Sequence, residues 1–120
     1  MWFDLILNSD GVDGEPSKLI HRQAFEKALF QLNGLIERIE KREEDRYFFL
    51  NPRLGAAIEI DTDEGEDFGS IYISVSDQNP NQANRTALGI AKHLAKELNL
   101  KIINPAEGIE YSLDSIRSLK

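Results

Sequence analysis

Two segments with alternating apolar residues, 56–61 and 68–76, stand on either side of a short stretch dominated by acids. Alternation with a period of two is typical of strands with one buried face, and a polar connection that contains glycine is typical of a hairpin. The second segment has the clearer pattern, because Ile71, Ile73 and Val75 share one face. We therefore expect an antiparallel β-hairpin whose turn carries negative charge.

The rest of the chain predicts strands and helices in a mixed order. Strands are expected where apolar residues alternate, and helices where they recur at spacings of three and four. The predicted elements are strand 2–7, helix 16–32, strands 35–41, 46–50, 56–61 and 68–76, helix 80–98, strand 100–103 and a short helix around 113–119. The highly charged stretch 40–45 is expected to be a turn, because its side chains cannot be buried.

This order, β-α-β-β-β-β-α-β-α, indicates the α+β class. Strands connected by hairpins favour a mostly antiparallel sheet, here of about five to six strands, and we expect the two main helices to pack on one of its faces. A chain of 120 residues has the usual size of one domain. We therefore expect residues 1–120 to form a single domain.

Charge and composition argue against several classes of function. The formal net charge is −7, with 14 basic residues among 21 acidic ones, which argues against a nucleic-acid-binding surface. The chain has no cysteine, so it has neither disulfides nor thiolate metal ligands. Asp4 interrupts the first apolar residues, which indicate a strand rather than a signal peptide, and no apolar run reaches the roughly 20 residues that span a bilayer. We expect a cytoplasmic protein without a membrane segment or a cofactor.

No motif indicates catalytic residues. The only histidines are His21 and His93, which lie outside any catalytic pattern and have no second ligand at the spacing of a metal pair, so we expect surface or half-buried side chains. Two carboxylates could act as an acid/base pair, and a hydrolytic or small-ligand-binding domain stays an alternative. The acidic turn is expected to be hydrated, whereas a catalytic acid needs surroundings that shift its pKa. We assign no catalytic residue and expect a protein that is not an enzyme.

The acidic turn has a partial likeness to a calcium-binding loop. In such loops a glycine stands at position six and a bidentate glutamate at position twelve. Counted from Asp61, the glycine here is fifth, at Gly65, and position twelve is Tyr72. The bidentate ligand is therefore missing, and we assign no metal site. Weak calcium binding is a further alternative, and a solvated hairpin turn explains the same residues more simply.

Acidic and aromatic side chains gather around the predicted hairpin. If the apolar residues of its strands face the helices, Glu59 and Tyr72 lie on the opposite face of the sheet, near Trp2. Aromatic side chains supply buried area in interfaces, and carboxylates steer basic partners. We therefore predict a surface that binds a basic protein. Its residues are Trp2, Glu59, Asp61, Asp63, Glu64, Glu66, Asp67 and Tyr72. Alternatively, Trp2 covers a small second core under the C-terminal segment.

Six short segments form an ordered pattern along the chain. They are FDL at 3–5, YFFLN at 47–51, LGAAI at 54–58, IYISV at 71–75, AKHLA at 91–95 and LNLKIINP at 98–105. In this order they resemble a group of small bacterial α+β proteins, some of which are immunity proteins that neutralise toxins delivered between competing cells. The resemblance implies a compact cytoplasmic inhibitor that covers its target, often with acidic residues against a basic active-site cleft. Because the segments encode the core, the resemblance transfers no site residue. Our leading hypothesis is a non-enzymatic protein-interaction domain, and its more specific form is an acidic immunity protein that neutralises a basic toxin domain by covering its surface.

Overall fold

The computed structural model describes residues 3–9, 18–32, 38–51, 56–75, 80–105 and 108–111. Within these ranges the chain forms two helices and nine strands. They are β1 (Phe3–Asn8), β2 (Ile20–His21), α1 (Arg22–Phe30), β3 (Arg38–Glu43), β4 (Arg46–Asn51), β5 (Ala56–Thr62), β6 (Asp67–Phe68), β7 (Ile71–Val75), α2 (Pro80–Leu98), β8 (Lys101–Asn104) and β9 (Ile109–Tyr111).

Seven of the strands form one sheet in the order β3-β4-β5-β7-β1-β8-β9, and β2 and β6 form a separate pair. Every pairing in the large sheet is antiparallel. The predicted pairing of the hairpin is confirmed, because β5 pairs with β7 in a register that places Ile60 opposite Ile73. The single strand predicted over 68–76 is divided, because Phe68 belongs to β6, which pairs with β2, and the strand of the large sheet begins at Ile71. The N-terminal strand β1 lies between β7 and β8, so it joins the hairpin to the C-terminal part of the sheet.

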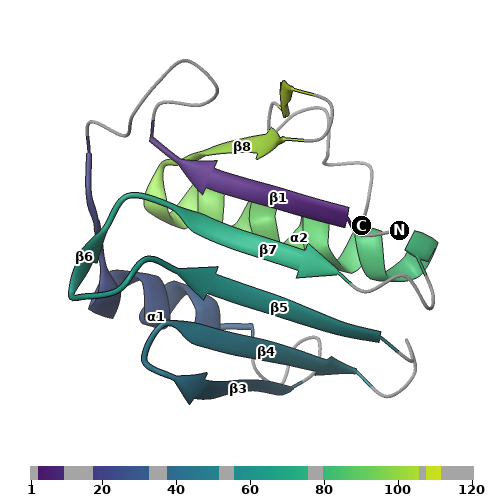
Figure 1. Ribbon diagram of the computed structural model, residues 1–120, viewed down its shortest axis with the longest axis horizontal. Coiled ribbons are helices and arrows are strands. Elements are labelled where there is room, and N and C mark those ends of the chain that lie inside the picture. The colour runs from purple at the N-terminus through teal and green to yellow at the C-terminus, as the bar shows by residue number, and fades with distance from the viewer. Residues whose placement is uncertain are drawn as a thin grey trace.

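Both helices lie on one face of the sheet, behind it in the view of Figure 1. Helix α2 contacts β7, β1, β8 and β5, and α1 contacts α2. The ring of Phe25 in α1 meets that of Tyr47 in β4 at a centroid distance of 5.2 Å, so α1 covers the other end of the sheet. The buried residues between the helices and the sheet form one hydrophobic core. The predicted α+β class is thus confirmed, with β9 adding a strand to the expected five to six.

Helix α2 ends in a turn that leads directly into β8. Asn99 adopts a left-handed backbone conformation, with φ 57°, and the amide of Leu100 donates to the carbonyl of Ala95 at 2.9 Å. This arrangement satisfies a carbonyl that the end of a helix would otherwise leave without a partner, and asparagine tolerates the left-handed conformation better than most residues. The reversal brings β8 back beside β1, so the C-terminal strands extend the same sheet.

The first helix is shorter than the sequence predicted. It begins at Arg22, because Ile20 and His21 are extended and pair with Phe68 and Asp67. Ile20 is buried as a strand residue, and Leu19, which lay inside the predicted helix, is 61% exposed. A tertiary strand pairing therefore overrides the helical spacing of this segment. The predicted helix start at 16 lies outside the described residues.

The prediction of a turn over 40–45 was partly wrong. Strand β3 continues to Glu43, and the turn consists of Glu44 and Asp45. An edge strand accepts charged residues because its outer side meets solvent, and β3 also contains a register shift between Lys41 and Glu43, a feature common at sheet edges. The short strand β9 was not predicted, and the helix expected around 113–119 lies outside the described residues.

Candidate functional site

The acidic loop, residues 63–66 between β5 and β6, is held from inside the protein by Arg22. The side chain of Arg22 is 4% exposed. Its guanidinium donates to the carbonyl of Asp63 at 2.8 Å and to that of Gly65 at 2.9 and 3.1 Å, and its amide donates to the carbonyl of Glu66 at 2.7 Å. Since these carbonyls are turned inward, the exposed acidic side chains extend toward solvent. The loop is therefore a fixed support for carboxylates.

Arg22 also begins a polar chain that runs under the edge of the sheet. Its guanidinium lies 4.6 Å from the ring centre of Phe68 and donates to the Tyr47 hydroxyl at 3.3 Å. That hydroxyl donates to Glu26 at 2.6 Å, and Lys41 bonds the same carboxylate at 2.6 Å. Burial, together with the bond to Glu26, raises the pKa of Tyr47 to about 12. For Glu26, burial alone would raise the pKa, but the bonds from Lys41 and Tyr47 lower it below its ordinary value.

The acidic residues of the sequence did not by themselves point to Arg22. A signal was present, because Arg22, Phe25 and Leu29 share one helical face, so the arginine stands in line with two core residues. Arginine is almost never buried without partners, and its five donors suit several carbonyls at once. A lone arginine on an apolar face therefore predicts a structural anchor. Its partners in the acidic loop could not be identified without the tertiary structure.

The face of the large sheet that lies away from the helices is called here the open face. Its side chains form two rows that cross β4, β5, β7 and β1, because the register aligns four residues in each. The rows are Arg46, Asp61, Tyr72, Ile6 and Phe48, Glu59, Ser74, Asp4. Tyr72 is 36% exposed and Asp4 is exposed, whereas Phe48, Glu59, Asp61, Ser74 and Ile6 are half-buried. The open face therefore combines aromatic, apolar and acidic groups that remain accessible.

Two neighbouring carboxyls, Glu59 and Asp61, occupy the middle of the open face and are called the carboxyl pair. The side chains share a hydrogen bond, and Arg46 Nε lies 3.6 Å from Glu59 and 3.7 Å from Asp61. Burial raises the pKa of Asp61 to about 7, helped by the bond to Glu59 and by its charge and opposed by Arg46. Asp61 Oδ1 is buried with no hydrogen-bond partner among the described residues. The closeness of the two carboxyls therefore disfavours the state in which both are ionised.

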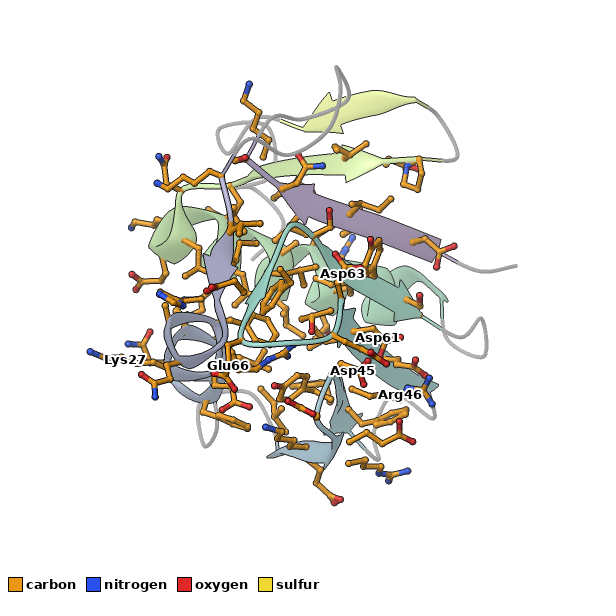
Figure 2. The ribbon with its side chains drawn as sticks, turned by 60° about the vertical axis from the view of Figure 1, so that its left-hand side comes forward. Lys27, Asp45, Arg46, Asp61, Asp63 and Glu66 are labelled. Atoms are coloured by element: carbon orange, nitrogen blue, oxygen red, sulfur yellow. The ribbon has the colours of Figure 1, made fainter. Side chains whose placement is uncertain are left out.

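The acidic loop and the open face meet at Tyr72. Its hydroxyl donates to Asp63 Oδ1 at 3.2 Å, and burial together with the charge of Asp63 raises the pKa of Tyr72. The backbone amide of Thr62, just before the loop, donates to the carbonyl of Asp45 at 3.0 Å, which ties the loop to the turn between β3 and β4. Figure 2 shows Asp45, Asp61 and Asp63 in one region with Arg46 beside them. The negative charge therefore continues from face to loop.

The remaining predicted site residues lie in different places. Glu64 borders a pocket of about 400 Å³ whose other described lining residues are Glu44, Asp45 and Gly65. Glu66 lies at the side of the loop toward α1 (Figure 2), and Asp67 pairs with His21 on the neighbouring strand β2. Trp2 lies outside the described residues. The structure thus brings six of the eight predicted residues, all but Trp2 and Asp67, to the open face or the acidic loop.

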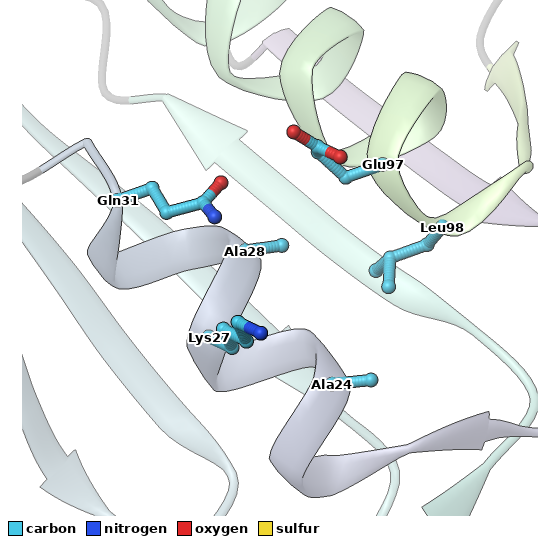
Figure 3. Close-up of a pocket in the computed structure, with 6 residues that line it drawn as sticks. All are labelled: Ala24, Lys27, Ala28, Gln31, Glu97 and Leu98. Carbon is cyan, nitrogen blue, oxygen red and sulfur yellow. The ribbon is translucent and has the colours of Figure 1, made fainter.

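A second pocket, of about 260 Å³, lies between α1 and α2 (Figure 3). It is lined by Ala24, Lys27, Ala28, Gln31, Glu97 and Leu98. Near it, a ring nitrogen of His93 lies 2.8 Å from the carbonyl of Ala28, so this histidine joins the two helices. The contact agrees with the expected half-buried position of His93. This pocket belongs to the helix layer, and none of its described lining residues belongs to the acidic loop or the open face.

No family model matches the chain, and no curated protein or solved structure shows significant similarity to it. The described part of the chain contains no group of three or more histidine, cysteine, aspartate or glutamate residues placed to hold a metal ion. Among the described helices none is long and apolar enough to cross a membrane. The arrangement of the acidic loop and the open face is therefore the basis for assigning a function.

Proposed function

We propose that this protein is a non-enzymatic interaction protein that docks a basic protein partner on the acidic loop and the open face. The observation that carries this proposal is the hydrogen bond from Tyr72 to Asp63, because it joins the two regions into one surface. A partner that covers both regions meets an apolar patch with carboxylates at its edge. This combination suits protein recognition, in which an apolar centre is surrounded by polar groups.

Each part of the surface has a separate physical role. Tyr72 and Phe48 supply aromatic area, and the half-buried Ile6 extends it. The exposed carboxylates of the acidic loop add a field that speeds the approach of a positively charged protein. The net charge of −7 acts in the same direction. Arg22 fixes the loop before binding, so little conformational entropy is lost when the partner arrives.

The finer form of the proposal is an immunity protein that neutralises a toxin by covering a basic active-site cleft. It is supported by the resemblance of the core segments and by the sign of the charge on the combined surface. A cytoplasmic location belongs to the same proposal, since an immunity protein of this kind must meet the toxin inside the cell. Occlusion needs no catalytic residue, only a surface that is complementary in shape and charge.

A carboxylate-based enzyme is the second candidate, and the raised pKa of Asp61 favours it. A carboxylic acid that stays protonated near neutral pH can donate a proton in catalysis. Two features weigh against this candidate. The carboxyl pair is in direct hydrogen-bond contact, whereas glycosidase carboxyls stand roughly 5 Å or more apart. Neither of the two pockets described above is lined by Glu59 or Asp61 among the described residues.

Affinity capture with two matched charge variants tests the proposal. The protein serves as bait for the native host's lysate and secreted fraction at low and moderate salt, and we expect a stoichiometric basic partner that salt releases. Glu64→Lys alters the acidic loop, and Glu97→Lys makes the same charge change on α2, behind the sheet. We expect Glu64→Lys to slow association with this partner several-fold and Glu97→Lys to leave it nearly unchanged. Equal rates for the two variants would remove the acidic loop from the interface.

A further inference from the structure

The two acids of the carboxyl pair stand close enough to share one proton. Glu59 and Asp61 are two residues apart on β5, so their side chains leave the same face of the strand. Two ionised carboxylates have only acceptor oxygens, so a hydrogen bond between them requires one proton. Both carboxyls approach the same Arg46 Nε, at 3.6 and 3.7 Å, and Asp61 Oδ1 is buried with no hydrogen-bond partner among the described residues. One arginine does not neutralise both acids at this spacing, so the geometry favours one shared proton on the pair.

The groups that face the carboxyl pair come from both neighbouring strands. From β4, Arg46 approaches both carboxyls, and its Nη1 also lies 3.9 Å from Oε1 of Glu43 in the edge strand β3. The turn between β3 and β4 adds Asp45, whose charge also raises the pKa of Asp61. From β7, Tyr72 stands opposite Asp61, with its hydroxyl bonded to Asp63. Arg46 therefore compensates only part of the negative charge near the pair, so a second cation that approaches it is attracted.

We propose that Glu59, Asp61 and Arg46 form a proton-dependent switch on the open face. In the closed form the two carboxyls share one proton. In the open form both are ionised, and the proton has passed to solvent. A guanidinium or ammonium group of a basic partner that reaches the pair stabilises the open form, so docking and proton release are coupled. This coupling rests on the proposed docking function, whereas the switch itself is a property of the free protein.

The switch has a definite working range. Because the pKa of Asp61 is raised to about 7, the closed form dominates at pH 6 and the open form at pH 8. If docking needs the open form, its apparent affinity falls by the fraction of protein that is open. The affinity is then about tenfold lower at pH 6 than at pH 8. Raising the pH also makes the open face more negative, which acts in the same direction.

The first part of the test is an NMR titration of side-chain carboxyl carbons between pH 4 and pH 9. We expect the Asp61 signal to titrate near neutral pH. Glu59→Gln should lower this midpoint by at least one pH unit, because an amide donor replaces the acid, and Arg46→Gln should raise it. Glu97→Gln, on α2, should leave it unchanged. A midpoint below pH 5 in the unaltered protein, or shifts in the same direction for both neighbours, would overturn the switch.

The second part uses a synthetic nona-arginine peptide as a basic probe. Calorimetry at pH 6 in two buffers with different ionisation enthalpies counts the protons released on binding. We expect up to one proton with the unaltered protein, fewer with Glu59→Gln, because its lower midpoint leaves less of Asp61 protonated at pH 6, and none from this site with Asp61→Asn. Binding without proton release would overturn the coupling and leave the docking surface in place. A neutral-range NMR titration without any peptide binding would support the switch and count against the proposed docking.

Discussion

The acidic loop and the open face hold negative charge in two different ways. In the loop, a buried arginine binds backbone carbonyls, and the acidic side chains are left to extend into solvent. On the open face, Glu59 and Asp61 are half-buried and bonded to each other, so one of them is held back from ionising. The first arrangement fixes where charge is presented, and the second makes its amount depend on pH. Backbone support and side-chain spacing therefore decide how an acidic surface behaves.

Loss of the Arg22 side chain, which anchors the acidic loop, should change the free energy of unfolding most. Arg22→Met removes the donor from the buried hydroxyl of Tyr47 and from the part-buried carbonyls of Asp63 and Gly65. We expect the free energy of unfolding to fall by about 3 kcal/mol, since each unsatisfied buried group costs about 1–3 kcal/mol and part of the loss is relieved by water. Urea denaturation monitored by circular dichroism measures this change.

The matched control for the anchor is Arg46→Met. Arg46 is half exposed, and its contacts with carboxylates are longer than 3.5 Å, so we expect a loss below about 1 kcal/mol. Arg22→Lys should fall between the two, because an ammonium group keeps the charge but cannot reach all the carbonyls with one fork of donors. Equal losses for Arg22→Met and Arg46→Met would show that the loop is not held by Arg22.

Asp61→Asn tests the open face through the pH dependence of stability. The folded state raises this pKa from 3.8 to about 7, so between these values the folded protein binds more protons than the unfolded chain. Stability from this group therefore falls as pH rises from about 4 to about 7, and the penalty is complete above that range. The full shift corresponds to about 4 kcal/mol, which solvent at a side chain that is 31% exposed reduces to about 1–2 kcal/mol.

We therefore expect Asp61→Asn to stabilise the protein by about 1–2 kcal/mol at pH 8 and to change little at pH 4. Asparagine is neutral at both values and can still bond Glu59. Thermal unfolding of both proteins from pH 4 to pH 8 makes the comparison, with Glu97→Gln as a control for the loss of one charge. Destabilisation that is the same at both ends of the range would mean that Asp61 is ionised throughout.

The backbone of the acidic loop gives a third prediction. Gly65 has φ 102°, a conformation that residues with a Cβ atom avoid, although an added Cβ would come no closer than 3.8 Å to another atom. Gly65→Ala should therefore cost about 1 kcal/mol from backbone strain alone. Gly89 lies exposed within α2 with open space around it, so Gly89→Ala should stabilise by about 0.5–1 kcal/mol. Chemical denaturation of the two variants measures both changes in the free energy of unfolding. Stabilisation by Gly65→Ala would contradict backbone strain at this position.

Periodicity predicted most of the fold because burial follows it closely. The alternation of Ile71, Ile73 and Val75 and the apolar stripe of α2 both led to the observed elements. The pattern failed where a distant segment decided the local structure. Ile20 and His21 are extended because Asp67 and Phe68 pair with them, and no spacing within the first helix reveals a partner more than 40 residues away.

The candidate site was predictable in composition and less so in structure. The hairpin register follows from alternation, so Glu59 and Tyr72 could be placed together on the face away from the helices. The acids predicted a hydrated turn. This prediction was incomplete, because the buried guanidinium of Arg22 also binds the backbone carbonyls of the turn. The pKa of Asp61 is raised by burial and held down in part by Arg46 of β4, and neither influence can be obtained from the residues of β5 alone.

The smallest effect is expected from the contact between His21 and Asp67 next to the acidic loop. His21 and Asp67 are in contact, but their side chains are 74% and 46% exposed, so water screens the attraction. His21→Ala should change the free energy of unfolding by less than about 0.5 kcal/mol. Ile20→Ala, the neighbouring buried residue of β2, should cost about 2–4 kcal/mol and shows that the assay detects damage to this strand pair. A loss above about 1 kcal/mol for His21→Ala would mean that side-chain charge, as well as Arg22, fixes the loop, and the contrast between the loop and the open face would then be one of degree.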